Sequence, residues 1–234
     1  MSNNKFLLRR MVIYCLGILI MATSVVVSVR SNLGVSPVSA IPYVQSQIFQ
    51  VEMGLCTTAT FLVFILLQVV LLGRKFQLKN LLQIFVATLY GSFVSFMGWV
   101  AAPLPQPATY PARLFFAVLG IVLLALGIML YTEARIMCLP PEGLMEAIAQ
   151  RFGIQRANAK IMLDSTCVVI AVVLSVLVLH NVQGVREGTV LAAVGIGSFL
   201  KLFQKLLGSR LKAFLHGEVL VQASELPAAL EGAE

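Results

Sequence analysis

The sequence predicts an all-α polytopic membrane protein with six transmembrane helices. We expect them to form a 3+3 inverted-topology repeat with a Pro-broken short helix after the first helix of each repeat. The 234-residue chain is 59% hydrophobic and 12% charged, and its mean hydropathy is +0.93. A soluble domain carries about 25% charged residues. Together with six apolar stretches and a pattern shared by the two halves, this composition excludes a soluble enzyme, a secreted disulfide scaffold and a disordered protein.

The six predicted spans occupy most of the chain and divide it into segments. The first span is uncharged from Met11 to Val29 and reaches roughly 28 Å, close to the hydrocarbon thickness of about 30 Å. That length favours an uncleaved span over a signal peptide. The spans are placed at 11–29, 54–73, 80–102, 113–132, 161–181 and 188–207. The predicted segments are a cytoplasmic N-terminus 1–10, a first three-helix repeat 11–102, a second repeat 113–208 and a cytoplasmic C-terminal tail 209–234.

Basic residues are distributed unevenly between the two sides of the predicted membrane. If the N-terminus is inside, only Arg30, Arg113 and Arg186 fall outside, and every other Lys and Arg falls inside. Positively charged residues resist translocation, so we predict a multi-pass protein of the bacterial inner membrane with both termini cytoplasmic. The net charge of +7 is scattered over separate segments, which argues against nucleic acid as a partner.

A weak internal repeat relates the two halves. Sliding the chain by 103 residues superposes matching residues in order, with three more residues in the next loop. The matches are Leu16-Gly17-Ile18 on Leu119-Gly120-Ile121, Pro37 on Pro140, Gln47 on Gln150, Phe49 on Phe152, and then Gly91-Ser92-Phe93 on Gly197-Ser198-Phe199. Each half has three crossings, an odd number, so its copy has the opposite orientation in the membrane. Such inverted repeats are common in secondary transporters.

Each repeat contains a Pro-containing polar segment after its first span. Gly and Pro break a helix, and the run that follows is too short to cross the bilayer. Pro37 suits the first turn of such a helix, with Ser36 as its cap. Two interpretations remain open, a surface-lying connector and a re-entrant helix whose N-terminal amides face a small-molecule substrate. The candidate substrate-binding residues are Asn32, Gly34, Ser36, Pro37, Ser39, Pro140, Pro141, Glu142 and Gly143.

Two carboxylates are candidates for ion or proton coupling. Asp164 lies in the fifth span, and an ionisable residue inside a membrane helix is a functional candidate. Lys160 precedes it by one helical turn, so a simple ion pair is the alternative. Glu142 follows the Pro140-Pro141 break, where the helix dipole stabilises a carboxylate.

Polar and small residues in the second, third and sixth spans predict contacts between helices. Gln68 and Gln83 are expected to form interhelical hydrogen bonds, although a minority of such residues could line a cavity. Gly91, Ser95 and Gly98 recur at helical spacing in the third span and should allow close approach to a neighbour. Gly195 and Gly197 do likewise in the sixth span.

Sequence motifs for catalysis or metal binding are missing from the chain. There is no phosphate loop, zinc-binding motif, nucleophile elbow or dinucleotide fingerprint. The four cysteines do not cluster with histidine at ligand spacing. We therefore expect no catalytic residue, no metal and no cofactor, and a protein that is not an enzyme.

Several short motifs resemble those of the YczE/YyaS/YitT group of bacterial membrane proteins. They are Leu16-Gly17-Ile18, Leu33-Gly34-Val35-Ser36-Pro37, Gly188-Thr189 and Pro140-Pro141-Glu142-Gly143. The likeness runs from about residue 10 to 208. The chain departs from the group's pattern at Met137-Cys138-Leu139, where a Gly usually precedes the proline. This resemblance implies an inner-membrane location and points to transport, without naming a substrate.

These observations predict a small secondary transporter or exporter of a small molecule, in contact with the lipid bilayer. One alternative is a non-transporting scaffold for a partner enzyme or complex, and another is the substrate-binding subunit of a larger transporter. A second copy of the chain is a further candidate partner.

Overall fold

The structure is a computed structural model that describes residues 2–216, and all regular structure in that range is helical. Six helical segments are long and apolar enough to cross a membrane. The prediction of an all-helical protein with six candidate spans is therefore confirmed for the described residues. The helices are α1 (Ser2–Ser31), α2 (Pro37–Phe49), α3 (Met53–Leu72), η1 (Gly73–Lys75), η2 (Leu78–Leu82), α4 (Gln83–Ala101), α5 (Tyr110–Ala134), α6 (Pro140–Phe152), α7 (Arg156–Leu179) and α8 (Glu187–His216).

The first and last helices extend furthest beyond the predicted limits of their spans. The segment expected to precede the first span is helical from Ser2, as part of α1. At the other end α8 continues through His216, so the first residues of the predicted tail are helical as well. The remaining tail, 217–234, lies outside the described residues.

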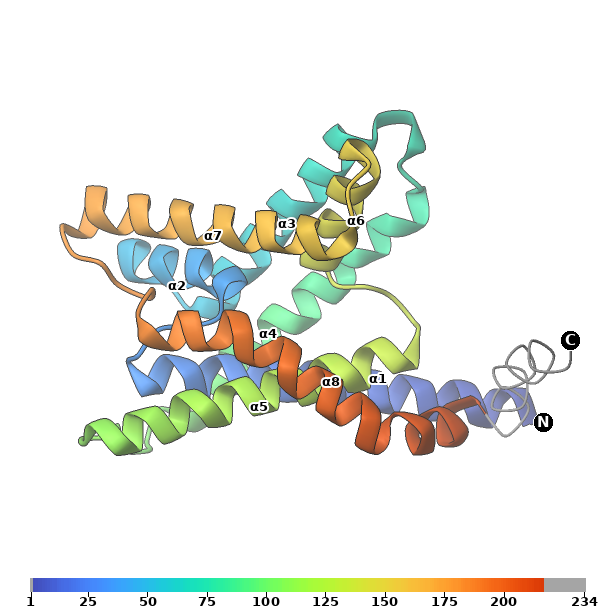
Figure 1. Ribbon diagram of the computed structural model, residues 1–234, viewed down its shortest axis with the longest axis horizontal. Helices are drawn as coiled ribbons and strands as arrows, with labels where there is room; N and C mark the ends of the chain where they lie inside the picture. Colours follow the sequence, from blue (N-terminus) through green and yellow to red (C-terminus); the bar gives the residue numbers. More distant parts are fainter. Residues whose placement is uncertain (1, 217–234) are drawn as a thin grey trace, which may run out of the picture.

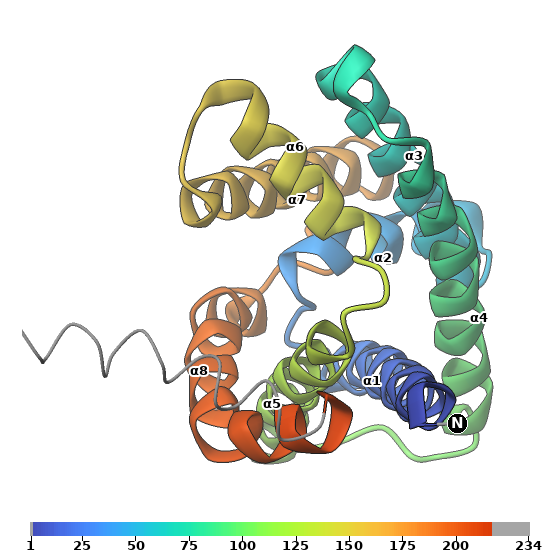
Figure 2. The ribbon, with the colours of Figure 1, turned by 90° about the vertical axis from the view of Figure 1, so that its right-hand side faces the viewer.

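The helices form two groups of four (Figures 1 and 2). In the first group, α5 packs against α1 and α8, and α1 also packs against α4. In the second group, α2 and α6 each pack against both α3 and α7. We call these the α1–α5 group and the α2–α6 group. Figure 2 shows α3 and α4 running along the edge where the two groups meet.

Small residues bring α1 and α5 together as an antiparallel pair. A Cβ built on Gly17 would lie 2.7 Å from the backbone nitrogen of Tyr131, and a Cβ on Gly120 would lie 3.3 Å from the carbonyl oxygen of Ser24. In lipid, helices associate through close van der Waals packing because no hydrophobic effect drives them together. The Arg10 side chain adds a hydrogen bond of 2.8 Å from Nε to the Ala134 carbonyl oxygen, near the end of α5.

The two Pro-containing segments form short helices, α2 and α6, of 13 residues each. Each begins with proline in its first turn, where the missing N–H has no helical partner to lose. The chain turns through left-handed residues at equivalent places in the two halves. These are Asn32 and Arg135 before the short helices, with φ of 52° and 50°, and Gln50 and Gly153 after them, with φ of 54° and 66°. A left-handed residue commonly terminates a helix.

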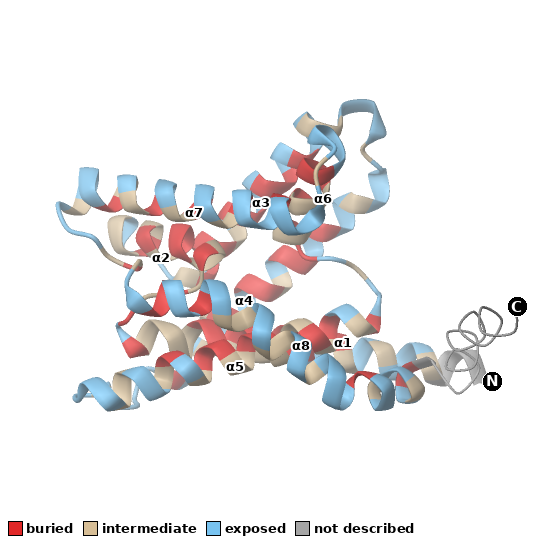
Figure 3. Cartoon of the chain, viewed as in Figure 1, coloured by how far each residue is buried: buried red, intermediate tan, exposed pale blue. Residues whose placement is uncertain are grey.

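The surface of the molecule is strongly apolar, and buried residues concentrate between the helices (Figure 3). Large side chains such as Leu66, Val70, Phe85, Trp99 and Val194 are exposed. Apolar patches of this extent on long helices indicate contact with the lipid bilayer. The protein is therefore a multi-pass membrane protein.

The two ends of the molecule differ in charge. One end, on the right in Figure 1, holds the start of α1, the connection from α3 to α4, the turn between α6 and α7 and the end of α8. Arg74, Lys75, Arg151 and Arg156 lie in these connections or beside them. We call it the basic end. The opposite end, which we call the far end, holds the α1–α2, α4–α5 and α7–α8 connections.

Candidate functional site

The connection into α2 is held against the start of α8. The Val35 N–H donates to the Gly184 carbonyl oxygen at 3.0 Å, and the Gly188 N–H donates to the Leu33 carbonyl oxygen at 2.8 Å. Gly34 has φ of 104°, and a Cβ there would lie 2.5 Å from the Thr189 hydroxyl oxygen. Only glycine fits this position, since both the backbone conformation and the contact exclude a side chain.

The predicted residues at the start of α2 face a compact polar environment. Arg186 donates from its guanidinium to the Asn32 carbonyl oxygen at 2.9 Å. Ser36 precedes the first turn, but its side chain makes no capping hydrogen bond. It donates instead to the Ser39 hydroxyl oxygen at 2.9 Å. Ser36 is thus the N-cap residue of α2, as expected, but it caps the helix without a side-chain hydrogen bond. Pro37 is buried.

A small cavity lies beside this connection, between α1, α5 and α8. Its lining includes Ser28, Gly34, Ser36, Gly120, Gly188 and Ala192. The two serine hydroxyls are the polar side-chain groups of the lining, and the rest of the lining is apolar, with Ile121 and Leu124 as its largest side chains. Two of the predicted site residues, Gly34 and Ser36, therefore border an internal space.

The start of α6 is embedded in a buried amide network. The Gln68 side-chain N–H₂ donates to the Gln83 side-chain oxygen at 3.0 Å and to the Pro140 carbonyl oxygen at 3.1 Å. The Gln83 amide nitrogen in turn lies 3.4 Å from the Cys138 sulfur as a donor. Both glutamines are 1% exposed. Because a buried amide without partners is costly, this network fixes the beginning of α6 against the last turns of α3 and the start of α4.

Gly143 allows the two glutamines to approach the first turn of α6. A Cβ on Gly143 would lie 2.6 Å from the Gln68 side-chain oxygen and 2.7 Å from the Gln83 side-chain nitrogen. Any side chain there would displace the network. Gly143 is thus required for packing, and its neighbours Pro140 and Pro141 are buried and half-buried, respectively.

Glu142 lies on the same turn and is half-buried. It forms no ion pair with any of the residues that the structure describes. Burial raises the pKa of the Glu142 carboxyl group to about 7, against the opposing effects of the Lys160 charge and the Leu139 backbone N–H. A carboxyl group with that pKa changes its protonation near neutral pH.

Tyr14 and the connection before α6 complete the surroundings of Glu142. The Tyr14 hydroxyl donates to the Met137 carbonyl oxygen at 3.0 Å, and its ring packs edge-on against Tyr131 at 6.2 Å between centroids. The Tyr131 hydroxyl is buried and has no hydrogen-bond partner in the described part of the chain. The start of α6 thus meets α1 as well as α3 and α4.

Asp164 is held by the ion pair that its spacing from Lys160 allows. The Lys160 Nζ atom lies 3.0 Å from Asp164 Oδ2, and the Asp164 side chain is 16% exposed. The other oxygen, Oδ1, is buried and accepts no hydrogen bond from any residue that the structure describes. One oxygen is therefore neutralised, and the other remains available to a further donor.

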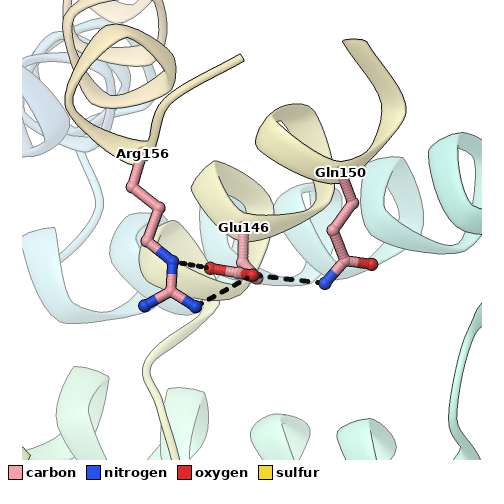
Figure 4. Close-up of polar contacts among 3 residues, drawn as sticks. All are labelled: Glu146, Gln150 and Arg156. Atoms are coloured by element: carbon pink, nitrogen blue, oxygen red, sulfur yellow. Dashed lines mark hydrogen bonds and ion pairs between the residues drawn. The ribbon is translucent and has the colours of Figure 1, made fainter. Parts of the chain in front are cut away.

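Glu146 is the third carboxylate of this region, and it belongs to the surface. Arg156 Nε lies 2.8 Å from one carboxylate oxygen, and Gln150 donates to the other at 3.2 Å (Figure 4). The Arg156 side chain is 74% exposed. The contact joins the end of α6 to the start of α7 and stabilises the turn between them.

The two predicted half-sites occupy different surroundings. The beginnings of α2 and α6 point toward the middle of the molecule, whereas their last turns point toward opposite ends (Figure 1). Within residues 2–216, no hydrogen bond or ion pair connects Ser36 or Ser39 to the Pro140–Glu142 segment. Each half-site is instead completed by its own partners, which are the start of α8 for α2, and the last turns of α3 with the start of α4 for α6.

The candidate site residues named from the sequence leave out four residues that build the second half-site, Tyr14, Gln68, Gln83 and Cys138. Gln68 and Gln83 were expected to bridge helices, and they do, but the tertiary structure adds that they converge on the α6 start. Polar residues in apolar spans were the available signal. Nothing in the spacing of Tyr14 or Cys138 indicated that they would meet there.

Comparison with known proteins shows similarity to uncharacterised proteins. The chain matches a family described as a family of unknown function (DUF6198) over residues 8–205. An uncharacterised protein of Haemophilus influenzae is 32% identical over 136 residues, which make up 58% of this chain and 56% of that protein. The chain thus spans little more than half the length of that relative. No solved structure matches the chain.

Proposed function

This chain belongs to the DUF6198 family of unknown function, and from that premise we propose that it is a small secondary transporter or exporter of the bacterial inner membrane. It works without enzymatic chemistry and takes a small molecule as substrate. Its termini lie in the cytoplasm, on the side of the basic end, since basic connections resist translocation. The resemblance to the YczE/YyaS/YitT group also favours transport at the inner membrane, and membership of that group remains a prediction.

One observation carries the proposal, namely the two short helices that begin with proline at equivalent places. A 13-residue helix is about 20 Å long and cannot cross a hydrocarbon core of about 30 Å. The beginnings of α2 and α6 face the middle of the molecule from opposite ends (Figure 1). Helix N-termini directed at the centre of an inverted repeat form the substrate sites of many secondary transporters.

The antiparallel packing of α1 and α5 supports the inverted repeat. Contacts recur under the 103-residue shift with the partners exchanged. Gly17 of α1 meets Tyr131 of α5, and the shifted pair, Gly120 of α5 and Ser28 of α1, is also in contact. Two copies related by a pseudo-twofold axis in the membrane plane have this property. We therefore assign residues 11–102 and 113–208 to oppositely oriented repeats.

The proposed substrate lies between the starts of α2 and α6. Asn32, Gly34, Ser36, Pro37 and Ser39 contribute one side. The other side is formed by Pro140, Pro141, Glu142 and Gly143. Glu142 is the better candidate for proton coupling, because it has no ion-pair partner among residues 2–216, whereas Asp164 is paired with Lys160 at 3.0 Å. Asp164 then maintains the position of Lys160 near Glu142.

A two-step experiment tests the proposal. Purified protein in detergent is first screened by thermal unfolding against metabolites, since a ligand that binds only the folded state raises the melting temperature. Each stabilising compound is then followed into proteoliposomes under an imposed pH gradient. We expect Glu142→Gln to reduce pH-driven uptake at least tenfold, Asp164→Asn to reduce it less, and the surface variant Glu146→Gln to leave it unchanged.

Unchanged uptake in both Glu142→Gln and Asp164→Asn would remove the carboxylates from the mechanism. Failure of every stabilising compound to cross the membrane would contradict transport itself.

A scaffold role is the second candidate, and the exposure of α8 favours it. In the apolar 18-residue stretch of α8 only 6% is buried, against 33% in the corresponding stretch of the span that contains α4. A partner protein could cover such a helix. A stable co-purifying protein together with no ligand response would support a scaffold. An energising complex that co-purifies would instead support a substrate-binding subunit of a larger transporter.

A further inference from the structure

The α1–α5 group and the α2–α6 group touch closely along one edge, between α3 and α4. Gly54 in the first turn of α3 lies against Gly91 and Ser95 of α4, and a Cβ on Gly54 would lie 2.7 Å from the Ser95 backbone nitrogen. A Cβ on Gly91 would in turn lie 2.5 Å from the Gly54 carbonyl oxygen and would meet the Thr58 hydroxyl. Gly54 and Gly91 are both buried. Since α3 starts at the far end, this contact closes the two groups there.

The equivalent contact in the second repeat is open. Gly197 of α8 corresponds to Gly91, and Ala157 of α7 corresponds to Gly54. Both are exposed, and a Cβ on Gly197 would meet nothing within 4 Å. Within the described residues, α7 and α8 do not pack against each other as α3 and α4 do. Figure 2, seen from the basic end, shows α7 and α8 apart on one edge and α3 and α4 together on the other.

The most extensive of the other contacts between helices do not show this difference. The pairs α2–α7 and α6–α3 are related by the repeat and both occur, as do α1–α4 and α5–α8. The departure from symmetry is therefore concentrated where the two groups meet. The same helix–helix contact is therefore closed in the first repeat, between α3 and α4, and open in the second repeat, between α7 and α8.

We infer that the protein has a second state in which these arrangements are exchanged. In that state α7 and α8 close at the basic end through Ala157 and Gly197, while α3 and α4 separate at the far end around Gly54 and Gly91. The inference rests on the proposed inverted repeat and describes how the proposed site alternates between the two sides. The described state is closed at the far end and open at the basic end.

The exchange replaces one contact between small residues by another. Closing α7 on α8 buries Ala157 and Gly197, as α3 and α4 now bury Gly54 and Gly91, while Ile161 and Lys201 stand where Thr58 and Ser95 stand in the first repeat. Two such states are both populated when their free energies differ by no more than a few kcal/mol. The far end of α8 has an anchor for such a movement, since the Gly188 N–H donates to the Leu33 carbonyl oxygen at 2.8 Å. The helix can then pivot about its start.

Disulfide cross-linking tests the inference without a known substrate. In a full-length protein whose four native cysteines are replaced, Ala157→Cys and Gly197→Cys are combined and the membranes are oxidised with copper phenanthroline. We expect an intramolecular cross-link at the monomer mass. The matched control combines Ala157→Cys with Phe199→Cys, which points about 200° away on α8, and should cross-link at least fivefold less.

A substitution in the other repeat provides a second measurement. Gly91→Ala places a methyl group against Thr58 and Gly54, so it should separate α3 from α4 and raise the rate of the Ala157–Gly197 cross-link severalfold. Gly98→Ala in the same helix, where a Cβ meets nothing within 4 Å, should leave that rate unchanged. If Gly91→Ala fails to fold, the cross-link between Ala157→Cys and Gly197→Cys without that substitution still tests the inference.

Equal cross-linking of the two cysteine pairs would overturn the exchange, and so would the absence of any monomeric product. A product at twice the monomer mass would overturn it too, because it would show that a second copy covers α8. These results are independent of flux. If the monomeric cross-link forms but the protein transports no compound, transport is rejected and the exchange of states is kept. If the protein transports a compound but the cross-link does not form, only the exchange of states is rejected.

Discussion

Gly17 and Gly127 face each other across the α1–α5 interface, each against the other's backbone. A Cβ on Gly17 would lie 3.0 Å from the Gly127 carbonyl oxygen, and a Cβ on Gly127 would lie 2.8 Å from the Gly17 carbonyl oxygen. Under the 103-residue shift the pair becomes Gly120 and Ser24, which also touch. The centre of the α1–α5 group is therefore a close contact between two backbones.

Larger side chains at this contact should destabilise the protein. We expect Gly17→Leu and Gly127→Leu each to lower the free energy of unfolding by about 1–3 kcal/mol, because overpacking forces the backbones apart. The measurement is the melting temperature in detergent. Gly98→Leu, in open space on α4, is the control and should unfold at the parent temperature. Equal effects at Gly98 and Gly17 would contradict the close contact.

Gln68 and Gln83 should be energetically coupled. Removal of one amide leaves buried partners without hydrogen bonds, at a cost of about 1–3 kcal/mol. We expect Gln68→Ala and Gln83→Ala each to show that cost, and the double variant to cost about 0.5–3 kcal/mol less than their sum. A double-mutant cycle of unfolding in detergent measures the coupling. Strict additivity would show that the amide network does not stabilise the start of α6.

Stability should depend on pH through Glu142. Its pKa is about 7 in the folded protein, above the ordinary value of 4.5, so the native state holds the proton more tightly between these pH values. The free energy of unfolding therefore falls as pH rises from about 4.5 to 7 and levels off above. Melting temperatures from pH 4.5 to 8 should show this decline in the parent and in Glu146→Gln. A decline that survives in Glu142→Gln would assign it to another group.

The inverted topology can be tested on intact cells. Lys75 lies in the connection between α3 and α4, and Asn181 in the connection between α7 and α8, and both are exposed. In a cysteine-free background, Asn181→Cys should react with a membrane-impermeant maleimide, and Lys75→Cys should react only after permeabilisation. Labelling of both from the same side would contradict the two oppositely oriented repeats.

The sequence predicted more of the fold than of the site. The sequence predicted the start of α2 at Pro37 and a break at Pro140-Pro141 ahead of a second short helical run, because proline interrupts a helix and has a local preference for its first turn. The Asp164–Lys160 pair was one of two stated alternatives, since it depends on spacing within one helix. Close approach was correctly expected at Gly91 and Ser95 but not found at Gly98, which has open space around it. That outcome depends on which face of α4 meets α3.

The amino-acid sequence alone determined the helical architecture, because hydropathy and backbone preferences act within a few residues of one another. Composition, span length and proline position were sufficient to predict a helical membrane protein with six candidate spans and two short helices that begin near proline. The convergence of Tyr14, Gln68, Gln83 and Cys138 on the start of α6 depends on helices far apart in the chain. So does the difference between a buried Gly91 and an exposed Gly197, since two similar residues acquired different neighbours only when the groups packed together.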